Sequence, residues 1–137
     1  IGSQLLPGAS GNISVEKIIS MNPDYYLMTG SKRPGKGTAI IPFGYNVPES
    51  DVVSAFNALL ARQGVSSIPA VVAGHTGALY HHFYNNPYNI IAIETLSKIF
   101  YPTQFKDVDP LADYHQLITQ FTHIPDDKVI LSYTPGK

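Results

Sequence analysis

The sequence contains no cysteine. This absence excludes disulfide bonds, thiolate metal ligands and a cysteine nucleophile from the chain. It does not identify the cellular compartment, because a cysteine-free chain can fold under oxidising or reducing conditions. Tryptophan is also absent, whereas there are nine tyrosines and six phenylalanines.

Charge is scarce as well. Charged residues make up 14% of the chain, and 9 Lys+Arg against 10 Asp+Glu give a formal net charge of −1. Nucleic-acid binding is disfavoured, because neutralising phosphates requires an excess of basic residues. A hydrophobic content of 44% with so little net charge favours a folded chain over a disordered one. No run of about 18 apolar residues occurs, so no membrane-spanning segment is predicted.

The length of 137 residues suits a single domain. The sequence begins at Ile1, without an initiator Met and without the charged and apolar regions of a signal peptide. We therefore expect a processed or N-terminally truncated piece of a longer protein.

Local signals predict four helices separated by short apolar segments. Each helix has a recognisable start, either a capping side chain or a proline at the first helical position. The predicted helices follow Ser14, Pro48, Asn86-Pro87 and Asp109-Pro110, and they end before Asn22-Pro23, at Gly64, at Tyr101-Pro102 and after Phe121.

Short apolar runs between these helices predict strands. Residues 25–29 lack polar alternation, as in a strand buried on both faces, and Gly30 ends the run. Residues 70–72 and 78–80 flank a glycine-containing turn and indicate two further strand segments, and residues 128–133 indicate a terminal strand. Helices alternating with strands predict an α/β protein with a partly parallel sheet. So thin a sheet again suggests a missing part.

Familiar catalytic motifs are missing. The sequence has no G-x-S-x-G nucleophile motif, and the glycine-rich residues 30–37 lack the Gly-Lys-Ser/Thr of a phosphate-binding loop. Residues 31–46 form a long predicted loop that carries Lys32, Arg33 and Lys36. Loops of this length are usually functional or disordered, although a solvated turn is the simpler interpretation of its Gly and Lys residues.

The five histidines show no spacing typical of a metal site. His81 and His82 are adjacent, so on an extended segment they would point to opposite sides. We interpret His75, His115 and His123 as structural or surface residues. His81 is different, because it opens a stretch crowded with tyrosine, phenylalanine and asparagine, side chains that often line ligand clefts at strand ends. The competing interpretation is core packing of the aromatic rings.

Three stretches carry a resemblance to a known family. Residues 14–24 read S-V-E-K-I-I-S-M-N-P-D and resemble an S-x-E…N-P-D element. Residues 68–74, I-P-A-V-V-A-G, resemble a P-A-V-x-x-G segment, and residues 80–89, Y-H-H-F-Y-N-N-P-Y-N, resemble the signature W-H-x-F-Y-x-S-P-Y-N. In order and spacing, residues 8–133 resemble the substrate-binding proteins of iron-complex and cobalamin ABC importers. Tyr80, His82 and Asn86 depart from the signature, which leaves the ligand open.

The resemblance implies one lobe of a bilobed protein. Members of this family have two α/β lobes joined by a long helix, with the ligand held between them. Residues 1–137 match only the C-terminal lobe, a Rossmann-like three-layer lobe with a small, mostly parallel sheet, so the N-terminal lobe is missing. The implied function is to capture a metal chelate, such as a ferric siderophore, haem or cobalamin, and to deliver it to the membrane permease. Such a protein is exported to the periplasm or cell surface, is not an enzyme and needs no cofactor besides its cargo.

These expectations select a set of site residues. Lys and Arg would stabilise an anionic chelate beside the aromatic and amide cluster. The predicted ligand-binding residues are His81, His82, Tyr84, Tyr88, Ser10, Lys32 and Arg33. A lobe without its partner is also expected to bind weakly and to self-associate through exposed sheet edges. Two alternatives stay open, a small metal-dependent hydrolase using His81 and a structural module without a ligand.

Glu16 is the predicted contact to the permease. In the resembled family, the glutamate of the S-x-E element lies on the outer face of the lobe and meets an arginine of the permease. On a helix, Glu16 lies about 100° around from the apolar Val15, so it can point outward. The simpler interpretation is an acid that stabilises the first turn of its helix, worth about 0.3–1 kcal/mol.

Overall fold

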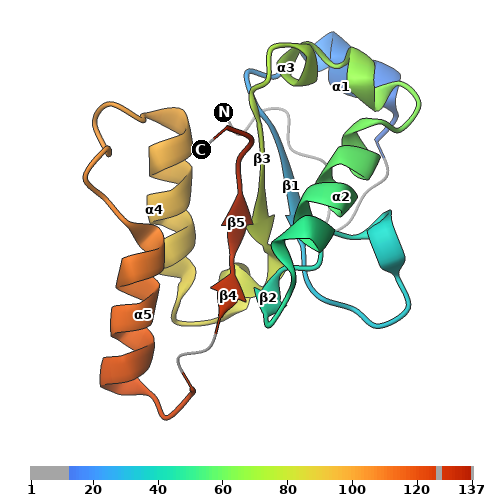
Figure 1. Cartoon of the computed structure of the whole chain (residues 1–137). Helices are drawn as coiled ribbons and strands as arrows, with labels where there is room; N and C mark the ends of the chain where they lie inside the picture. Colours follow the sequence, from blue (N-terminus) through green and yellow to red (C-terminus); the bar gives the residue numbers. More distant parts are fainter. Residues whose placement is uncertain (1–12, 126–127, 137) are drawn as a thin grey trace.

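The computed structural model describes residues 13–125 and 128–136 and shows a mixed α/β fold (Figure 1). Its α-helices are α1 Val15–Met21, α2 Glu49–Leu60, α3 Pro69–Val72, α4 Asn89–Phe100 and α5 Pro110–Phe121. The 3₁₀ helices are η2 Gly37–Ala39, η3 Val65–Ser67 and η4 His81–Asn85. The strands are β1 Tyr26–Gly30, β2 Gly44–Tyr45, β3 Thr76–Tyr80, β4 Val129–Ile130 and β5 Ser132–Tyr133.

The larger sheet has the strand order β1-β3-β5. Strands β1 and β3 run parallel, and their register extends from the pair Tyr26 and Thr76 to the pair Gly30 and Tyr80. Strand β5 is antiparallel to β3, with Tyr133 opposite Ala78, while β2 and β4 form a separate antiparallel pair. The carboxyl ends of β1 and β3 therefore lie side by side at one edge of the sheet, where the following loops begin.

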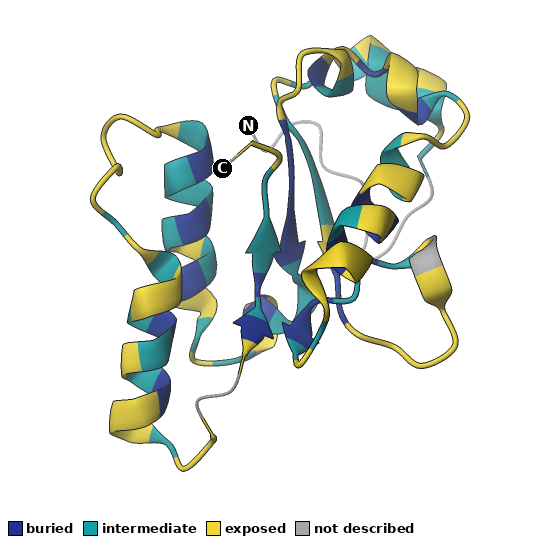
Figure 2. Cartoon of the chain, viewed as in Figure 1, coloured by how far each residue is buried: buried dark blue, intermediate teal, exposed yellow. Residues whose placement is uncertain are grey.

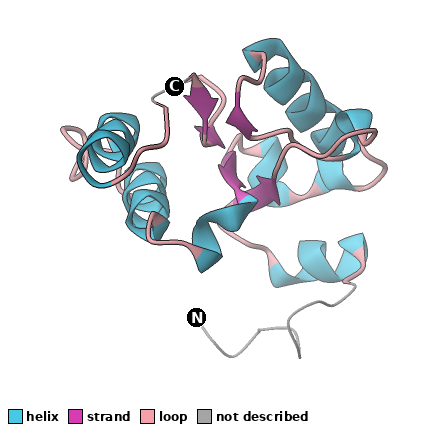
Figure 3. Ribbon diagram, turned by 90° about the horizontal axis from the view of Figure 1, so that it is seen from below, coloured by secondary structure: helices cyan, strands magenta, loops and turns pink. Residues whose placement is uncertain are grey.

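Helices cover both faces of this sheet, as the view from below shows (Figure 3). The side chains of consecutive residues in β3 point to opposite faces of the sheet. Ala78 packs into the cluster under α2, whereas a Cβ at Gly77 would lie only 3.3 Å from Leu27 and 3.5 Å from Ile99 of α4. The glycine thus lets α4 approach the sheet closely, and the lobe has three layers as expected.

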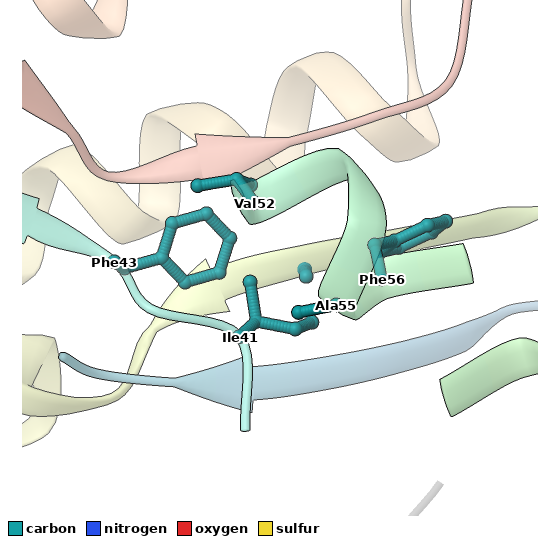
Figure 4. Close-up of a cluster of buried hydrophobic side chains, with 6 residues drawn as sticks. Ile41, Phe43, Val52, Ala55 and Phe56 are labelled. Carbon is teal, nitrogen blue, oxygen red and sulfur yellow. The ribbon is translucent and has the colours of Figure 1, made fainter. Parts of the chain in front are cut away.

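The main hydrophobic core lies between α2 and the sheet (Figure 4). Its largest side chains, Phe43 and Phe56, are fully buried, and the ring of Phe56 packs edge-on against Tyr133 with centroids 4.9 Å apart. Full burial of such a side chain stabilises the fold by about 1.5–3 kcal/mol. The cluster consists of Ile41, Phe43, Val52, Ala55, Phe56 and Ala78.

A second core cluster joins η4, α4 and α5 to the β4–β5 segment, and a third joins α1 to η3 and α3. Buried residues follow the strands and the inward sides of the helices, whereas the outer sides are exposed (Figure 2). In the part of the chain that the structure describes, no helix is long and apolar enough to cross a membrane.

Two of the four predicted helix starts, at Ser14 and Asp109, are confirmed with their capping side chains, and Pro48 directly precedes α2. The start predicted at Asn86-Pro87 is wrong, because α4 begins at Asn89 after Tyr88 and Asn86 instead ends η4. The Ser14 hydroxyl accepts a hydrogen bond from the backbone N–H of Lys17 at 3.2 Å. The Asp109 carboxylate accepts from the N–H groups of Leu111 and Ala112 at 3.2 and 3.1 Å. Asn22, with φ of 44°, adopts the left-handed conformation that ends α1 before Pro23.

The strand predicted at residues 70–72 is wrong, because these residues lie in helix α3. Pro69 occupies the first turn, where its fixed φ suits a helix. The carbonyl of Ile68 then accepts hydrogen bonds from the N–H groups of Val71 and Val72 at 2.9 and 3.0 Å. Local proline geometry thus outweighs the strand preference of the two valines.

Two other predictions about the elements need correction. Strand β1 is half-buried rather than buried on both faces, because it lies at the edge of the described sheet. The predicted strand at 128–133 is divided at Leu131 into β4 and β5, which belong to different sheets. The loop at 31–46 also contains η2 and β2.

Candidate ligand-binding site

Two of the predicted site segments leave the sheet at the same place. Strand β1 ends at Gly30 and β3 ends at Tyr80, and these two residues are paired in the parallel register. The loop with Lys32 and Arg33 follows β1, and His81 follows β3 directly. In open α/β sheets, ligands bind outside the carboxyl ends of the strands. The fold therefore brings the start of the basic loop and the start of the histidine segment to one edge.

The backbone at the end of β1 is held firmly. A Cβ at Gly30 would lie 2.2 Å from the carbonyl oxygen of Ile41, so only glycine fits there. Ser31 is buried, and the N–H of Lys32 donates a hydrogen bond to the carbonyl of Phe43 at 2.8 Å. The basic loop thus begins from a fixed backbone, while the side chains of Lys32 and Arg33 are exposed.

The two adjacent histidines do not point to opposite sides of an extended segment, as the sequence had suggested. They begin the 3₁₀ helix η4, in which successive side chains turn by about 120°. The rings of His81 and His82 are neighbours, with centroids 5.5 Å apart. Asn86 closes this turn, because its amide donates to the carbonyl of His82 at 2.7 Å and accepts from the N–H of Tyr88 at 2.8 Å.

His81 is the central side chain of this edge. Its Nδ1 lies 3.2 Å from Oγ1 of Thr29, and its ring packs against that of Tyr84 with centroids 5.3 Å apart. Tyr84 is 71% exposed, which is unusual for so large an aromatic side chain. The three residues form a partly open wall of imidazole, phenol and hydroxyl groups. Thr29 was missed from the sequence, because nothing local indicates a partner 52 positions away.

His82 packs against a different ring from the one that His81 contacts outside the histidine pair. Its ring contacts that of Tyr80 with centroids 5.3 Å apart, and Tyr80 in turn packs against Phe83. Burial, with a smaller contribution from Tyr45, raises the pKa of the Tyr80 phenol. Tyr80 therefore stays neutral and can offer a hydroxyl group, and sequence analysis had noted it only as a departure from the tryptophan of the signature.

Tyr88 belongs to a different cluster. Its ring packs against the buried Tyr114 with centroids 5.4 Å apart, and the Tyr114 hydroxyl is hydrogen-bonded to that of Tyr45. Burial and this hydrogen bond raise the pKa of Tyr114 well above its usual range. These contacts agree with the core-packing interpretation of Tyr88, although its half-buried ring leaves part of the side chain accessible.

The remaining predicted residues lie elsewhere. Ser10 is outside the described residues. Glu16 is exposed in the first turn of α1. Its own backbone N–H and the Ser14 hydroxyl hold the pKa of Glu16 below the ordinary value, so the carboxylate is ionised at neutral pH.

The structure also contains a cavity of about 370 Å³. It is bounded by α4, the start of α5 and the β4–β5 segment, and none of the predicted ligand-binding residues lines it. Lys98 at its wall is engaged, because its Nζ donates to the carbonyl of Val108 at 2.5 Å. Within residues 13–125 and 128–136, no group of three or more His, Cys, Asp or Glu side chains could hold a metal ion. The hydrolase alternative therefore gains no support from these residues.

Comparison with known proteins gives a likeness to solved structures. No family model matches the chain, and no curated protein matches it. The crystal structure of the TroA-like periplasmic binding protein FepB from Veillonella parvula matches 90% of the chain, with a TM-score of 0.81 and 28% sequence identity.

The chain has the fold of one lobe of a TroA-like periplasmic binding protein. It spans 35% of the length of the Veillonella protein. The Veillonella protein is a periplasmic binding protein, and this chain is similar to one part of it. The predicted α/β lobe and the resemblance to periplasmic binding proteins are thereby confirmed, whereas the ligand, the permease and the site residues stay predictions.

Proposed function

We propose that this chain is the C-terminal lobe of an exported solute-binding protein that captures a metal chelate and delivers it to an ABC importer permease. The single observation that carries the proposal is the match of 90% of the chain to a TroA-like periplasmic binding protein. The cargo would be a ferric siderophore, haem or cobalamin, and the protein would act in the periplasm or at the cell surface. A second, N-terminal lobe would complete the site.

The geometry of the sheet edge supports this cargo class. Lys32 and Arg33 are exposed on the loop that follows β1, at the same edge of the sheet where β3 leads into His81, whose ring packs against the exposed Tyr84. Cationic side chains favour the anionic oxygens that many metal chelates present, and aromatic rings favour their flat organic parts. One lobe provides only half of such a site, so affinity would depend on closure of two lobes over the cargo.

Calorimetric titration of the full-length protein tests the proposal. The probes are a ferric tris(catecholate) chelate, haemin and cyanocobalamin, each added separately. We expect one probe to bind, and we expect His81→Ala combined with Tyr84→Phe to weaken its binding at least tenfold. His75→Ala is the matched control, because His75 is exposed and precedes β3 at the opposite edge of the sheet. Unchanged affinity in the double variant would show that the site lies elsewhere.

A further inference from the structure

One hydrogen bond links the two strands at the proposed site. Thr29 is the penultimate residue of β1, and His81 is the first residue after β3. Oγ1 of Thr29 lies 3.2 Å from Nδ1 of His81. Because the bond joins a side chain of β1 to the residue that follows the neighbouring strand β3, it fixes the imidazole relative to the edge of the sheet.

Both partners have backbones that the fold holds in place. Thr29 is in register with Leu79 in the parallel ladder, and the close approach of Ile41 to Gly30 fixes the next residue. His81 begins η4, and its ring also contacts the rings of His82 and Tyr84. The imidazole is thus supported from both sides, and the Thr29 contact uses only its Nδ1 atom.

The bond at Nδ1 determines what Nε2 can do. In a neutral imidazole one nitrogen carries the proton and the other accepts, and the partner of one nitrogen sets the role of the other. If the threonine hydroxyl donates to Nδ1, the ring proton resides on Nε2, which becomes a donor. An Nε2–H donor suits an anionic oxygen, the same chemistry that Lys32 and Arg33 on the neighbouring loop would recognise.

We propose that Thr29 is a positioning residue that acts through His81. Its hydroxyl donates to Nδ1, orients the ring and keeps the proton on Nε2, which then donates a hydrogen bond to an anionic oxygen of the bound chelate. This inference rests on the proposed function. It adds Thr29 to the site and specifies that the threonine hydroxyl is the donor in the hydrogen bond with His81.

The test compares Thr29→Val, which removes the hydroxyl but keeps the β-branched shape, with Thr29→Ser, which keeps the hydroxyl. Each is titrated in the full-length protein with the probe that binds among the three named above. Thr29→Val is expected to weaken binding roughly two- to tenfold, and Thr29→Ser to restore it. Thr103→Val, an exposed change in the turn after α4, is the matched control.

A double-mutant cycle separates positioning from a general structural effect. If Thr29 acts through His81, then Thr29→Val has no further effect on binding in a His81→Ala background. Equal loss in Thr29→Ser and Thr29→Val, or a full additional loss in the His81→Ala background, would overturn the inference. If His81→Ala weakens binding but Thr29→Val does not, the proposed function stands and this inference fails.

A second measurement does not depend on the cargo. Long-range proton–nitrogen correlation spectra of the 137-residue chain, recorded where the ring is neutral, report which nitrogen of His81 carries the proton. We expect the proton on Nε2 in the unaltered chain and in Thr29→Ser, and a shift toward a mixture in Thr29→Val. A proton on Nδ1 would overturn the inference. If no probe binds the unaltered protein, the proposed function and the binding part of the inference fail together, while the spectrum still decides the direction of the bond.

Discussion

Individual residues show which contacts the local sequence can predict and which it cannot. Ser14 and Asp109 were recognised as caps because a capping side chain bonds N–H groups two or three positions ahead, which is a property of the sequence. The partner of His81 could not be found in this way. Thr29 and His81 are brought together only by the parallel pairing of β1 and β3, so their contact depends on the tertiary structure.

Glu16 carries a prediction at the same scale. Its carboxylate is exposed and ionised, and it lies in the first turn of a helix that buries its apolar side against η3 and α3. If it docks the permease, Glu16→Lys should leave chelate binding unchanged but lower uptake into vesicles carrying the cognate permease roughly tenfold or more. Charge reversal at a docking surface replaces attraction by repulsion.

The matched control is Asp51→Lys, because Asp51 is also an exposed acid in a first turn, on α2. Transport that falls equally in both variants would indicate a nonspecific effect of charge. Unchanged transport in Glu16→Lys would leave Glu16 as an ordinary acid that stabilises the start of its helix.

At the scale of elements, the sequence predicted long helices well and short segments poorly. The helices α2, α4 and α5 each have twelve residues, so their apolar spacing repeats over several turns and predicts each helix, even though α4 begins at Asn89 rather than at Asn86-Pro87. Four residues at 69–72 offer less than two turns of pattern, and there the proline decided the structure. The separation of β4 from β5 depends on which sheet each strand pairs with, and local sequence does not specify this.

The pairing of α4 with α5 makes stability depend on pH through Glu94. Burial first, then the charge of Asp113 on α5 and a hydrogen bond with it, raise the pKa of the Glu94 carboxyl. Its Oε2 is buried and has no hydrogen-bond partner among the described residues. An acid whose pKa is raised on folding favours the folded state below its unfolded pKa, and this stability is lost as pH rises through the folded value.

Glu94→Gln should therefore raise the melting temperature of the chain at neutral pH. At that pH solvent favours the ionised carboxylate, whereas burial and the charge of Asp113 disfavour it in the folded state. The gain should shrink as the pH is lowered below about 4.5, because the native carboxyl is then protonated and costs nothing to bury. Thermal unfolding followed by circular dichroism at neutral and acidic pH measures both effects. Glu49→Gln, at an exposed position in α2, is the control, and an equal response in the two variants would contradict the role of Glu94.

At the scale of the whole molecule, the lobe is recognisable but its ligand is not. The order of three short motifs predicted an importer binding protein, and the match to the Veillonella structure confirms the fold. The predicted ligand-binding residues stay a prediction: the basic loop and His81 follow paired strand ends at one edge of the sheet, whereas Tyr88 packs against the core residue Tyr114. Cargo specificity would arise from both lobes together, so one lobe of 137 residues does not determine it.

The last prediction is that this chain self-associates when it is isolated. The contact would form along the free edge of β1, which is the long side of the strand that faces away from β3. In the described sheet β1 pairs only with β3, and unpaired backbone groups along an edge strand favour pairing with another chain. The N–H of Tyr26 points toward β3, because it donates to the carbonyl of His75 at 2.9 Å. Since hydrogen-bonding direction alternates along a strand, the N–H groups of Leu27 and Thr29 point to the free edge.

Hydrogen exchange and sedimentation can therefore test edge pairing together. As concentration rises through the micromolar range, sedimentation should show dimers or larger species, and the amides of Leu27 and Thr29 should become protected from exchange. The amide of Met28 faces β3 and is the internal control, since its protection should change little. Association without protection of Leu27 and Thr29 would place the contact on another surface. A compact monomer at every concentration would mean that the β1 edge is not available to a second chain.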